Sequence, residues 1–386
     1  MAKVLIDTRI SQRYSQPVGL GRREEKTIQS GFGRGALPEA DRSHPSGSFF
    51  LSSTHSNLAR IPALSTAASP SFAVNSKRVQ RASRVVRRVE LCREHVLLSI
   101  AVTAFPATLP GQFVQLMCSD RPSDEGEVEH EWMPGRPLQL SGAEVCERTA
   151  LLRRPFSLAG RRDSANGTEI DIILRTVGAG TEWLAQLREG DTLDVLGPLG
   201  NSFGLPPRGG RALMVGGGVG IPPMIYLAER LARDGVEGVA FCGAMTRDLL
   251  SLTLVENSAR PTLAEFDRHG IGSVVTTDDG SVGRKGFVTD ALVDYLDTAA
   301  LPADTIIYTC GPEGMMLRVA EIARRRGIAC QVCVERAMAC GMGTCQSCVI
   351  KVKKDDPALP PLAGKDWCYR LACTDGPVFS ADKLLW

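Results

Sequence analysis

The sequence lacks long hydrophobic runs, a large net charge of either sign, and histidines in any recognisable motif. No apolar run approaches the roughly 18 residues that a membrane-spanning helix needs, so we expect no contact with a membrane. The 45 Lys and Arg residues against 43 Asp and Glu give a net charge of +2, which excludes a global field that would attract nucleic acid. The five histidines are His44, His55, His95, His130 and His269. None lies in a motif, so we expect no catalytic residue here and place acid–base chemistry on an organic substrate elsewhere.

The composition is that of an ordinary globular protein with many cysteines. A length of 386 residues predicts two or three domains, with 43% hydrophobic and 23% charged residues. Twelve cysteines in such a chain indicate a reducing compartment and a cofactor rather than a disulfide framework. No secretory hydrophobic region is present, and we expect a cytoplasmic protein.

Residues 1–78 predict a disordered extension. They are rich in Ser, Gly, Arg and Pro and show no sustained period of 2 or 3.6. A transit peptide would share the Arg and Ser but would be poor in acids, and Glu24, Glu25, Glu39 and Asp41 argue against it. A solvated tail or a misplaced start codon is the interpretation we prefer.

Residues 79–207 predict a small antiparallel β-barrel. Short alternating hydrophobic runs, such as residues 96–100 and 170–174, are separated by Gly and Pro turns. An acidic, Pro-containing segment at 119–149 interrupts this pattern and is typical of a surface insertion between strands.

Two short pieces of this region could hold a cofactor. Residues 154–157 place a cation, a proline, an aromatic ring and a hydroxyl together in what we interpret as a turn. Gly178, Gly180 and Thr181 open a helix whose N-terminus offers free N–H groups to a phosphate. Each signal is weak alone, because an Arg-Pro turn and a glycine cap both occur without any ligand.

Residues 208–330 predict a doubly wound α/β domain. A buried strand at 211–215 runs into the loop of Gly216, Gly217, Gly218 and Gly220, and a helix follows at 221–233. Strand, glycine loop and helix form the first unit of a dinucleotide-binding domain, although this loop is not the strict G-x-G-x-x-G motif. A later strand ends in Cys310, Gly311 and Pro312, at the sheet edge where nucleotides bind. For Cys310 a buried structural role is the alternative.

Residues 331–386 carry the most specific pattern in the chain. Cys340, Cys345 and Cys348 have the C-x4-C-x2-C spacing of a plant-type 2Fe-2S cluster, whereas structural zinc sites usually use C-x2-C pairs at both ends. Cys368 and Cys373 are both candidates for the fourth ligand. We favour Cys373, which precedes a Gly-Pro turn, and expect Cys368, between two aromatic residues, to pack as a small hydrophobe.

Taken in order, these motifs resemble the ferredoxin–NADP reductase superfamily fused to a plant-type cluster domain. The likeness is closer to the electron-transfer subunits of NAD-linked (type B) dihydroorotate dehydrogenase, and it covers about residues 80–386. Stretches 195–203, 276–286, 338–345 and 373–379 carry it. The ordered combination is far more specific than any single motif.

The resemblance implies FAD in the barrel, NAD in the α/β domain and a 2Fe-2S cluster at the C-terminus. It places Gly216, Gly217, Gly218, Gly220, Cys310, Gly311 and Pro312 at the nicotinamide nucleotide. It places Cys340, Cys345, Cys348 and Cys373 on iron. It places the following residues at the flavin: Arg154, Pro155, Phe156, Ser157, Ile173, Leu174, Arg175, Gly180 and Thr181.

A redox function also follows from matching the number of electrons that each cofactor exchanges. Nicotinamide exchanges a hydride, an iron–sulfur cluster exchanges one electron, and a flavin is the usual cofactor able to do both. The resemblance further implies an FMN-containing dihydroorotate dehydrogenase catalytic subunit as partner, in a heterotetramer with two of each chain. Subunits of other flavin and iron–sulfur NAD(P)H oxidoreductases remain alternatives, as does a zinc-bound regulatory module.

The choice between NAD and NADP is open from the residues alone. A carboxylate near the adenosine ribose favours NAD and a cation favours NADP, and the loop after the second α/β strand offers both, in Arg247 and Asp248. The resemblance favours NAD.

Overall fold

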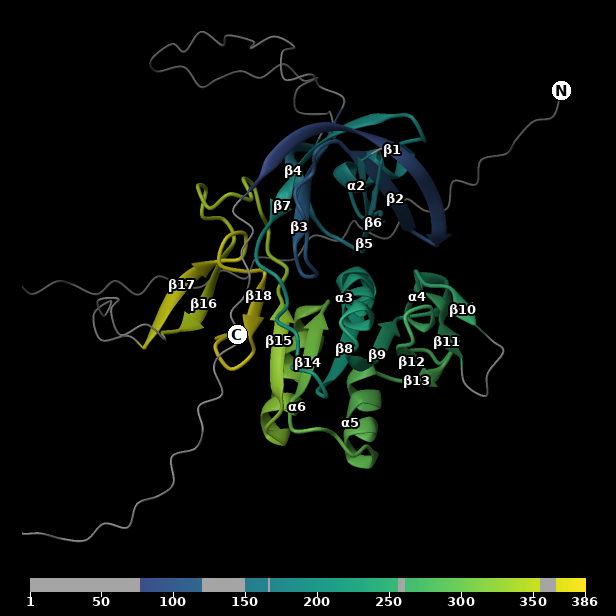
Figure 1. The fold of residues 1–386 in the computed structure, drawn as a ribbon, viewed down its shortest axis with the longest axis vertical. Coiled ribbons are helices and arrows are strands. Elements are labelled where there is room, and N and C mark those ends of the chain that lie inside the picture. Colours follow the sequence, from purple (N-terminus) through teal and green to yellow (C-terminus); the bar gives the residue numbers. More distant parts are fainter. Residues whose placement is uncertain (1–76, 120–149, 166, 256–260, 355–365) are drawn as a thin grey trace, which may run out of the picture. The chain divides into compact units, whose positions relative to one another are not determined.

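The computed structural model describes residues 77–119, 150–165, 167–255, 261–354 and 366–386 (Figure 1). Nearly all of the predicted extension at 1–78 and of the predicted insertion at 119–149 lies outside these residues.

The N-terminal part of the described chain is an antiparallel sheet with one short helix. Its elements are β1 (Val79–Cys92), β2 (His95–Val102), β3 (Phe113–Cys118), β4 (Ala150–Ser157), β5 (Gly160–Ser164), β6 (Gly167–Arg175), α2 (Ala179–Gln186) and β7 (Thr192–Leu199). Within the described residues the strands pair in the order β4-β3-β7-β1-β2-β6-β5. Alternate residues such as Leu98 and Ile100 are fully buried, and they build one hydrophobic core under the sheet. The predicted antiparallel barrel-type sheet is confirmed.

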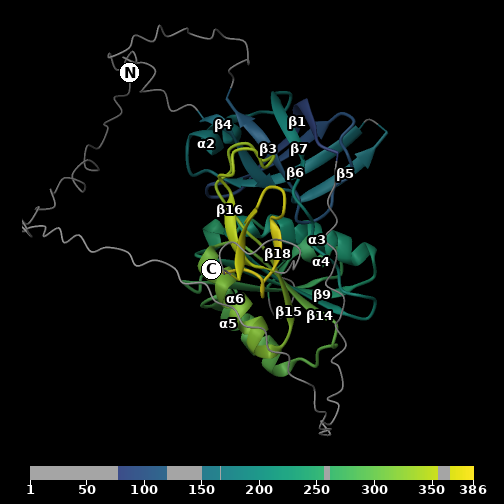
Figure 2. The ribbon, with the colours of Figure 1, turned by 90° about the vertical axis from the view of Figure 1, so that its left-hand side faces the viewer.

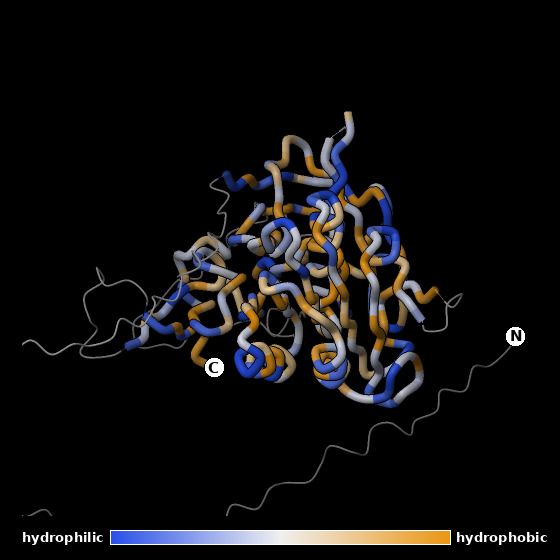
Figure 3. Tube along the Cα trace, turned by 60° about the horizontal axis from the view of Figure 1, so that its bottom comes forward, coloured by the Kyte–Doolittle hydropathy of each residue, from blue (hydrophilic) through white to orange (hydrophobic). Residues whose placement is uncertain are grey.

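The central part is an α/β domain built on a parallel sheet. Its strands are β8 (Arg211–Gly217), β9 (Glu237–Ala244), β12 (Gly272–Thr277), β13 (Arg284–Lys285) and β14 (Thr305–Cys310), with β10 (Leu254–Val255) and β11 (Thr262–Leu263) as a separate pair. Its helical elements are η1 (Gly218–Gly220), α3 (Pro222–Arg233), η2 (Arg247–Leu249), α4 (Ala264–Asp267), α5 (Val288–Thr298) and α6 (Glu313–Arg326). Strands β8 and β14 are predominantly hydrophobic, as expected for a parallel sheet covered on both faces. Figure 3 shows hydrophobic residues gathered inside the described part of the chain and hydrophilic residues mostly at its periphery.

Helices cover both faces of this sheet. In β8, Leu213 and Val215 pack in the core that contains residues of α5 and α6. The alternating residues Ala212 and Met214 pack in the core that contains residues of α3 and α4. This alternation confirms the doubly wound arrangement predicted from the sequence.

The C-terminal part completes the same sheet and adds a hairpin. Its strands are β15 (Ala329–Cys333), β16 (Val349–Lys353), β17 (Trp367–Leu371) and β18 (Val378–Ser380). Strand β15 joins the sheet parallel to β14, and β18 then pairs antiparallel with β15 (Figures 1 and 2). Strands β16 and β17 form a separate antiparallel pair. Strand β15 thus runs across residue 330, where the sequence predicts a domain boundary.

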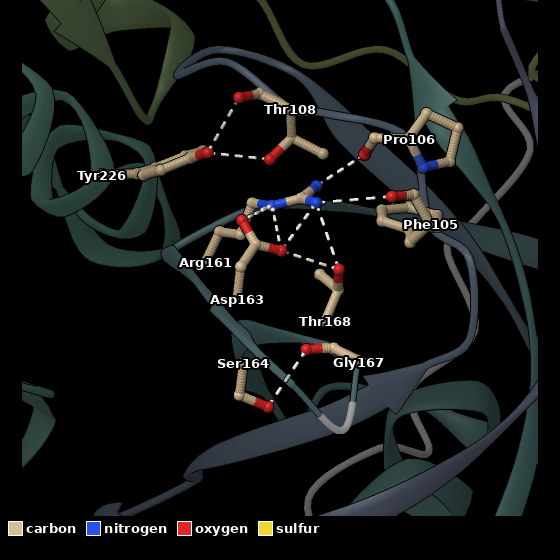
Figure 4. A network of polar contacts seen from close by, with 9 residues as sticks. All are labelled: Phe105, Pro106, Thr108, Arg161, Asp163, Ser164, Gly167, Thr168 and Tyr226. Atoms are coloured by element: carbon tan, nitrogen blue, oxygen red, sulfur yellow. Dashed lines mark hydrogen bonds and ion pairs between the residues drawn. The ribbon is translucent and has the colours of Figure 1, made fainter.

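A polar network joins the barrel to helix α3 (Figure 4). The hydroxyl of Tyr226 in α3 lies 2.7 Å from Thr108 Oγ1 and donates to the Thr108 carbonyl at 3.0 Å. Arg161 of β5 donates to the neighbouring carbonyls of Pro106, at 2.5 Å, and Phe105, at 3.3 Å. Because burial removes water from the phenol, it raises the pKa of Tyr226. The loop between β2 and β3 is therefore fixed on both sides.

Among the described residues, no helix combines the length and the hydrophobicity needed to span a membrane.

Candidate functional site

The largest feature of the site is a cavity of about 970 Å³. It is lined by β4, β6, the start of α2, the loops that follow β8 and β14, and the segment 333–338. Every residue that the sequence analysis placed at the flavin lines it: Arg154, Pro155, Phe156, Ser157, Ile173, Leu174, Arg175, Gly180 and Thr181. Sequence positions that lie far apart therefore meet in one site.

The Arg-Pro-Phe-Ser stretch is a strand, so the sequence interpretation of it as a turn is wrong. These residues end β4, where Arg154 pairs with Leu116 and Ser157 pairs with Phe113 of β3. Strand β4 is at the edge of the sheet. An edge strand tolerates a proline such as Pro155 because only one of its sides is hydrogen-bonded to a neighbouring strand. Arg154 and Phe156 are two residues apart in this extended strand, so they lie on the same face, and both line the cavity.

The start of α2 supplies a backbone binding surface. Gly180 and Thr181 lie in its first turn rather than before it. The Thr181 hydroxyl accepts hydrogen bonds from the backbone N–H groups of Val177, at 2.9 Å, and Gly178, at 3.1 Å, and it donates to the Gly178 carbonyl at 2.9 Å. Thr181 therefore fixes the loop, and the remaining N–H groups of the first turn are suited to a phosphate.

The cavity fits a flavin dinucleotide. Arg154 and Arg175 provide cations for phosphate, and Phe156, Ile173 and Leu174 provide apolar surface for a ring system. An ion pair of 2.8 Å with Glu94 holds the Arg175 guanidinium in place.

A second cavity of about 680 Å³ lies at the carboxyl ends of β8 and β9. Gly217, Gly218 and Pro312 line it, as the sequence analysis expected for the nucleotide, and Arg175 lines both cavities. Asp278, Thr289 and Arg318 add polar groups. The carboxyl edge of a parallel sheet is the usual place for a dinucleotide, so the residues present fit NAD.

The other predicted nucleotide residues lie elsewhere. Gly220, Cys310 and Gly311 line the larger cavity instead, and Gly216 is buried against Ile221 and Met224. A Cβ on Gly220 would meet the Cys310 carbonyl carbon at 2.3 Å and its oxygen at 2.2 Å, so only glycine permits this approach of the two loops. The two loops thus close one wall of the larger cavity.

His95 is a site residue that sequence reasoning missed. It is 2% exposed and lines the smaller cavity. Its Nδ1 lies 2.9 Å from the Arg93 carbonyl and must donate there, while Nε2 is buried and has no hydrogen-bond partner in the part of the chain that the structure describes. Burial lowers the pKa of His95, which favours the neutral ring. No motif surrounds this residue, so only the pairing of β2 with β6, which sets His95 beside Arg175, reveals it.

In the loop that carries Arg247 and Asp248, the carboxylate forms an ion pair with another residue of the protein. Asp248 lies 3.0 Å from the Arg93 guanidinium. The backbone N–H of Arg247 donates to the Ser281 hydroxyl at 2.8 Å.

The cysteines of the C-terminal loop form two neighbouring pairs. Cys345 is close to Cys340, whose sulfur accepts backbone N–H bonds from Met342 and Cys345 at 3.4 Å each. Cys373 lies beside Cys348, and both are 1% exposed. Among the described residues no three His, Cys, Asp or Glu side chains converge on a single metal ion. Two pairs of thiols fit a cluster of two irons better than one tetrahedral zinc.

The thiol pKa values reflect where each pair lies. Hydrogen bonding to Ser347 and then to Cys340 lowers the pKa of the exposed Cys345 to about 6. Burial, and then the neighbouring Cys348, raise the pKa of Cys373 to about 12. A buried thiol of this kind becomes a thiolate ligand only when a metal ion supplies positive charge.

The alternative fourth ligand, Cys368, lies in a different place. It is in β17, where it pairs with Val352 of β16 and packs against the hydrophobic core. Cys373, by contrast, follows β17, and Asn201 anchors the backbone just after it. The Asn201 side chain donates to the carbonyls of Asp375, at 3.0 Å, and Val378, at 2.8 Å. The arrangement favours Cys373.

Comparisons with known proteins agree with this geometry. The family model "iron–sulfur cluster binding domain of dihydroorotate dehydrogenase B" matches residues 335–385, and the model "oxidoreductase NAD-binding domain" matches residues 214–321. The dihydroorotate dehydrogenase B (NAD(+)) electron transfer subunit of Caldanaerobacter subterraneus subsp. tengcongensis is 34% identical over 68% of this chain and 93% of that protein. The Geobacillus thermodenitrificans protein of the same name is 37% identical over 74% of this chain and 94% of its own length.

The chain belongs to this family of electron transfer subunits. A solved structure supports the same fold: an NADH-dependent reduced ferredoxin-NADP oxidoreductase, studied for flavin-based electron bifurcation, is similar with a TM-score of 0.60 and 26% identity. The match covers 79% of this chain and 90% of that one. Together these matches support the predicted cofactors: FAD, a 2Fe-2S cluster and NAD. The chain is an oxidoreductase subunit of the NAD-linked flavin and iron–sulfur type.

Proposed function

We propose that this chain carries electrons from dihydroorotate oxidation, through a 2Fe-2S cluster and FAD, to NAD+ in pyrimidine biosynthesis. The oxidation itself takes place in an FMN-containing catalytic subunit, and two copies of each chain form a heterotetramer in the cytoplasm. The relatives are named as electron transfer subunits of dihydroorotate dehydrogenase B (NAD(+)), and these names support this assignment. We propose no nucleic-acid or membrane partner.

One observation carries the proposal: all three parts of the chain line the larger cavity. The barrel contributes Arg154, the α/β domain contributes Gly220 and Cys310, and the C-terminal part contributes residues 333–338, which lead directly to Cys340. A flavin bound there supplies the exchange of either a hydride or single electrons. Its site thus borders both the nucleotide loops and the start of the cluster loop.

The residues of the chain orient the groups and exclude water. Arg175, shared by the two cavities, is suited to hold phosphate at their junction, and Glu94 keeps its guanidinium in place. The apolar side chains of Phe156 and Leu174 limit the access of water to the cavity. In our proposal Cys340 and Cys345 bind one iron, and Cys348 and Cys373 bind the other.

Reconstitution with the cognate catalytic subunit tests the proposal. We expect NAD+-dependent oxidation of dihydroorotate only when both chains are mixed. The catalytic subunit alone should still oxidise dihydroorotate with an artificial acceptor, because that half-reaction needs only its own flavin. Turnover of dihydroorotate by this chain alone, or no gain on mixing, would contradict the proposal. Electron exchange between NADPH and ferredoxin instead would favour the oxidoreductase type of the structural neighbour.

A further inference from the structure

Gln115 lies between the larger cavity and the cysteine loop. It is in β3, is 0% exposed, and pairs across the sheet with Pro155 of β4. Pro155 and Phe113, two residues before Gln115 on β3, both line the larger cavity. Gln115 is therefore buried in the wall of the proposed flavin site without being part of its lining.

The Gln115 side chain contacts the loop that carries the first cluster cysteine. Its Nε2 donates to the Ala339 carbonyl, at a donor–acceptor distance of 3.4 Å. A Cβ added to Gly341 would lie 2.7 to 2.9 Å from the end of the Gln115 side chain, so the loop backbone packs directly on the amide. Gly341 also has a φ of 67°, in the left-handed region that glycine accepts readily. Residues on both sides of Cys340 thus touch one barrel side chain.

The amide is only half satisfied by the described residues. Gln115 Oε1 is buried with no hydrogen-bond partner. Leaving a buried acceptor unpaired costs free energy, whereas an apolar side chain of similar size would fill the same space without that cost. A polar group kept in such a place calls for an explanation beyond packing.

The position of this loop controls the surroundings of a cluster sulfur. Backbone N–H groups of Met342 and Cys345 donate to Cys340 Sγ. Hydrogen bonds to the sulfurs are among the features that set the reduction potential of an iron–sulfur cluster. A side chain that fixes residues 339 and 341 therefore fixes the backbone from which those bonds arise.

We infer that Gln115 is a positioning residue that holds the cluster loop against the flavin barrel, and so sets the cluster potential and the rate of electron exchange with the flavin. The inference rests on the proposed cofactor order. Ordinary packing is the alternative, and it predicts that any side chain of similar shape will serve equally well.

Gln115→Met tests this, because methionine keeps the length of the side chain and loses the amide. We expect NADH to reduce the flavin at an unchanged rate, while reduction of the cluster by the flavin slows about tenfold, the lower end of the effect of removing an outer-sphere partner. The midpoint potential and the paramagnetic resonance g-values of the reduced cluster should also shift. Gln115→Leu, which also lacks the amide and brings no charge near the cluster, should shift them too.

Gln331→Met is the matched control. Gln331 is also buried, at 3% exposed, and its amide is paired with the backbone N–H and carbonyl of Gly204 rather than with the cluster loop. The Gln331→Met variant should change the stability of the protein while leaving the cluster spectrum unchanged. Unchanged cluster signals in both Gln115 variants, or equal shifts in the Gln331 variant, would overturn the inference. If Gln115→Met does not fold, the spectrum of Gln115→Leu decides. If NADH proves not to be the electron donor, dithionite can reduce the cluster instead. The midpoint potentials and g-values of the variants can then still be compared.

Discussion

Cys373 and Cys368 are five residues apart, yet their surroundings differ completely. Cys373 is buried beside Cys348, whereas Cys368 lies within β17, paired with Val352 of β16. A thiolate is needed on iron, and a hydroxyl is a poor replacement. Cys368, in contrast, is half-buried, and a serine in its place should leave the pairing of β16 with β17 intact.

Cys373→Ser should therefore remove or severely weaken the cluster while FAD stays bound, because Cys373 itself does not line the cavity that we assign to flavin. Cys368→Ser should retain the cluster. Electron paramagnetic resonance of the reduced protein measures both variants, with flavin fluorescence after denaturation as the control for FAD. A signal that vanishes in the Cys368 variant and persists in the Cys373 variant would show that the ligand assignment is wrong.

For individual residues, the sequence predicts the chemical role of a side chain better than its place in the fold. The cysteine spacing points to Cys340, Cys345 and Cys348 because liganding imposes a local pattern. His95 carries no such pattern, since its place in the smaller cavity arises from pairing with a strand about 80 residues further on. Contacts set by long-range pairing leave no trace in the neighbouring residues.

Among the elements, α3 has two roles that the sequence shows only in part. Its start follows the glycine loop, as predicted, and its middle presents Tyr226 to the barrel. The hydroxyl satisfies the Thr108 carbonyl inside a buried contact. Helix α3 therefore couples the nucleotide loop to the loop between β2 and β3.

Tyr226→Phe should lower the free energy of unfolding by about 1–3 kcal/mol, because it leaves buried polar groups of Thr108 unpaired. Denaturant-induced unfolding, followed by circular dichroism, measures the change. Tyr369→Phe is the matched control, since Tyr369 is 59% exposed and should lose almost nothing. Equal stability of the two variants would mean that the contact does not hold the barrel to α3.

The element pattern was predictable where periodicity is strong. Strand β8 and helix α3 follow the hydrophobic pattern that the sequence shows directly. Strand β4 was not predictable as a strand, because a proline argues against one unless the strand is known to lie at a sheet edge. Edge position is a property of the assembled sheet.

Across the described chain, the barrel, the α/β domain and the C-terminal part all line the larger cavity. Strand β18 of the C-terminal part completes the α/β sheet, and segment 333–338 lines the flavin cavity. The order of motifs along the sequence predicts which parts exist, but the sharing of one cavity by all three depends on how the strands assemble.

An anaerobic reductive titration of the isolated chain tests this account directly. We predict uptake of about three electrons per chain, two at the flavin and one at the cluster, with bleaching of the visible absorption and a resonance signal from the reduced cluster. NADH should supply these electrons through the flavin. A colourless protein that binds zinc, or a flavoprotein that takes up only two electrons and shows no resonance signal, would contradict the account.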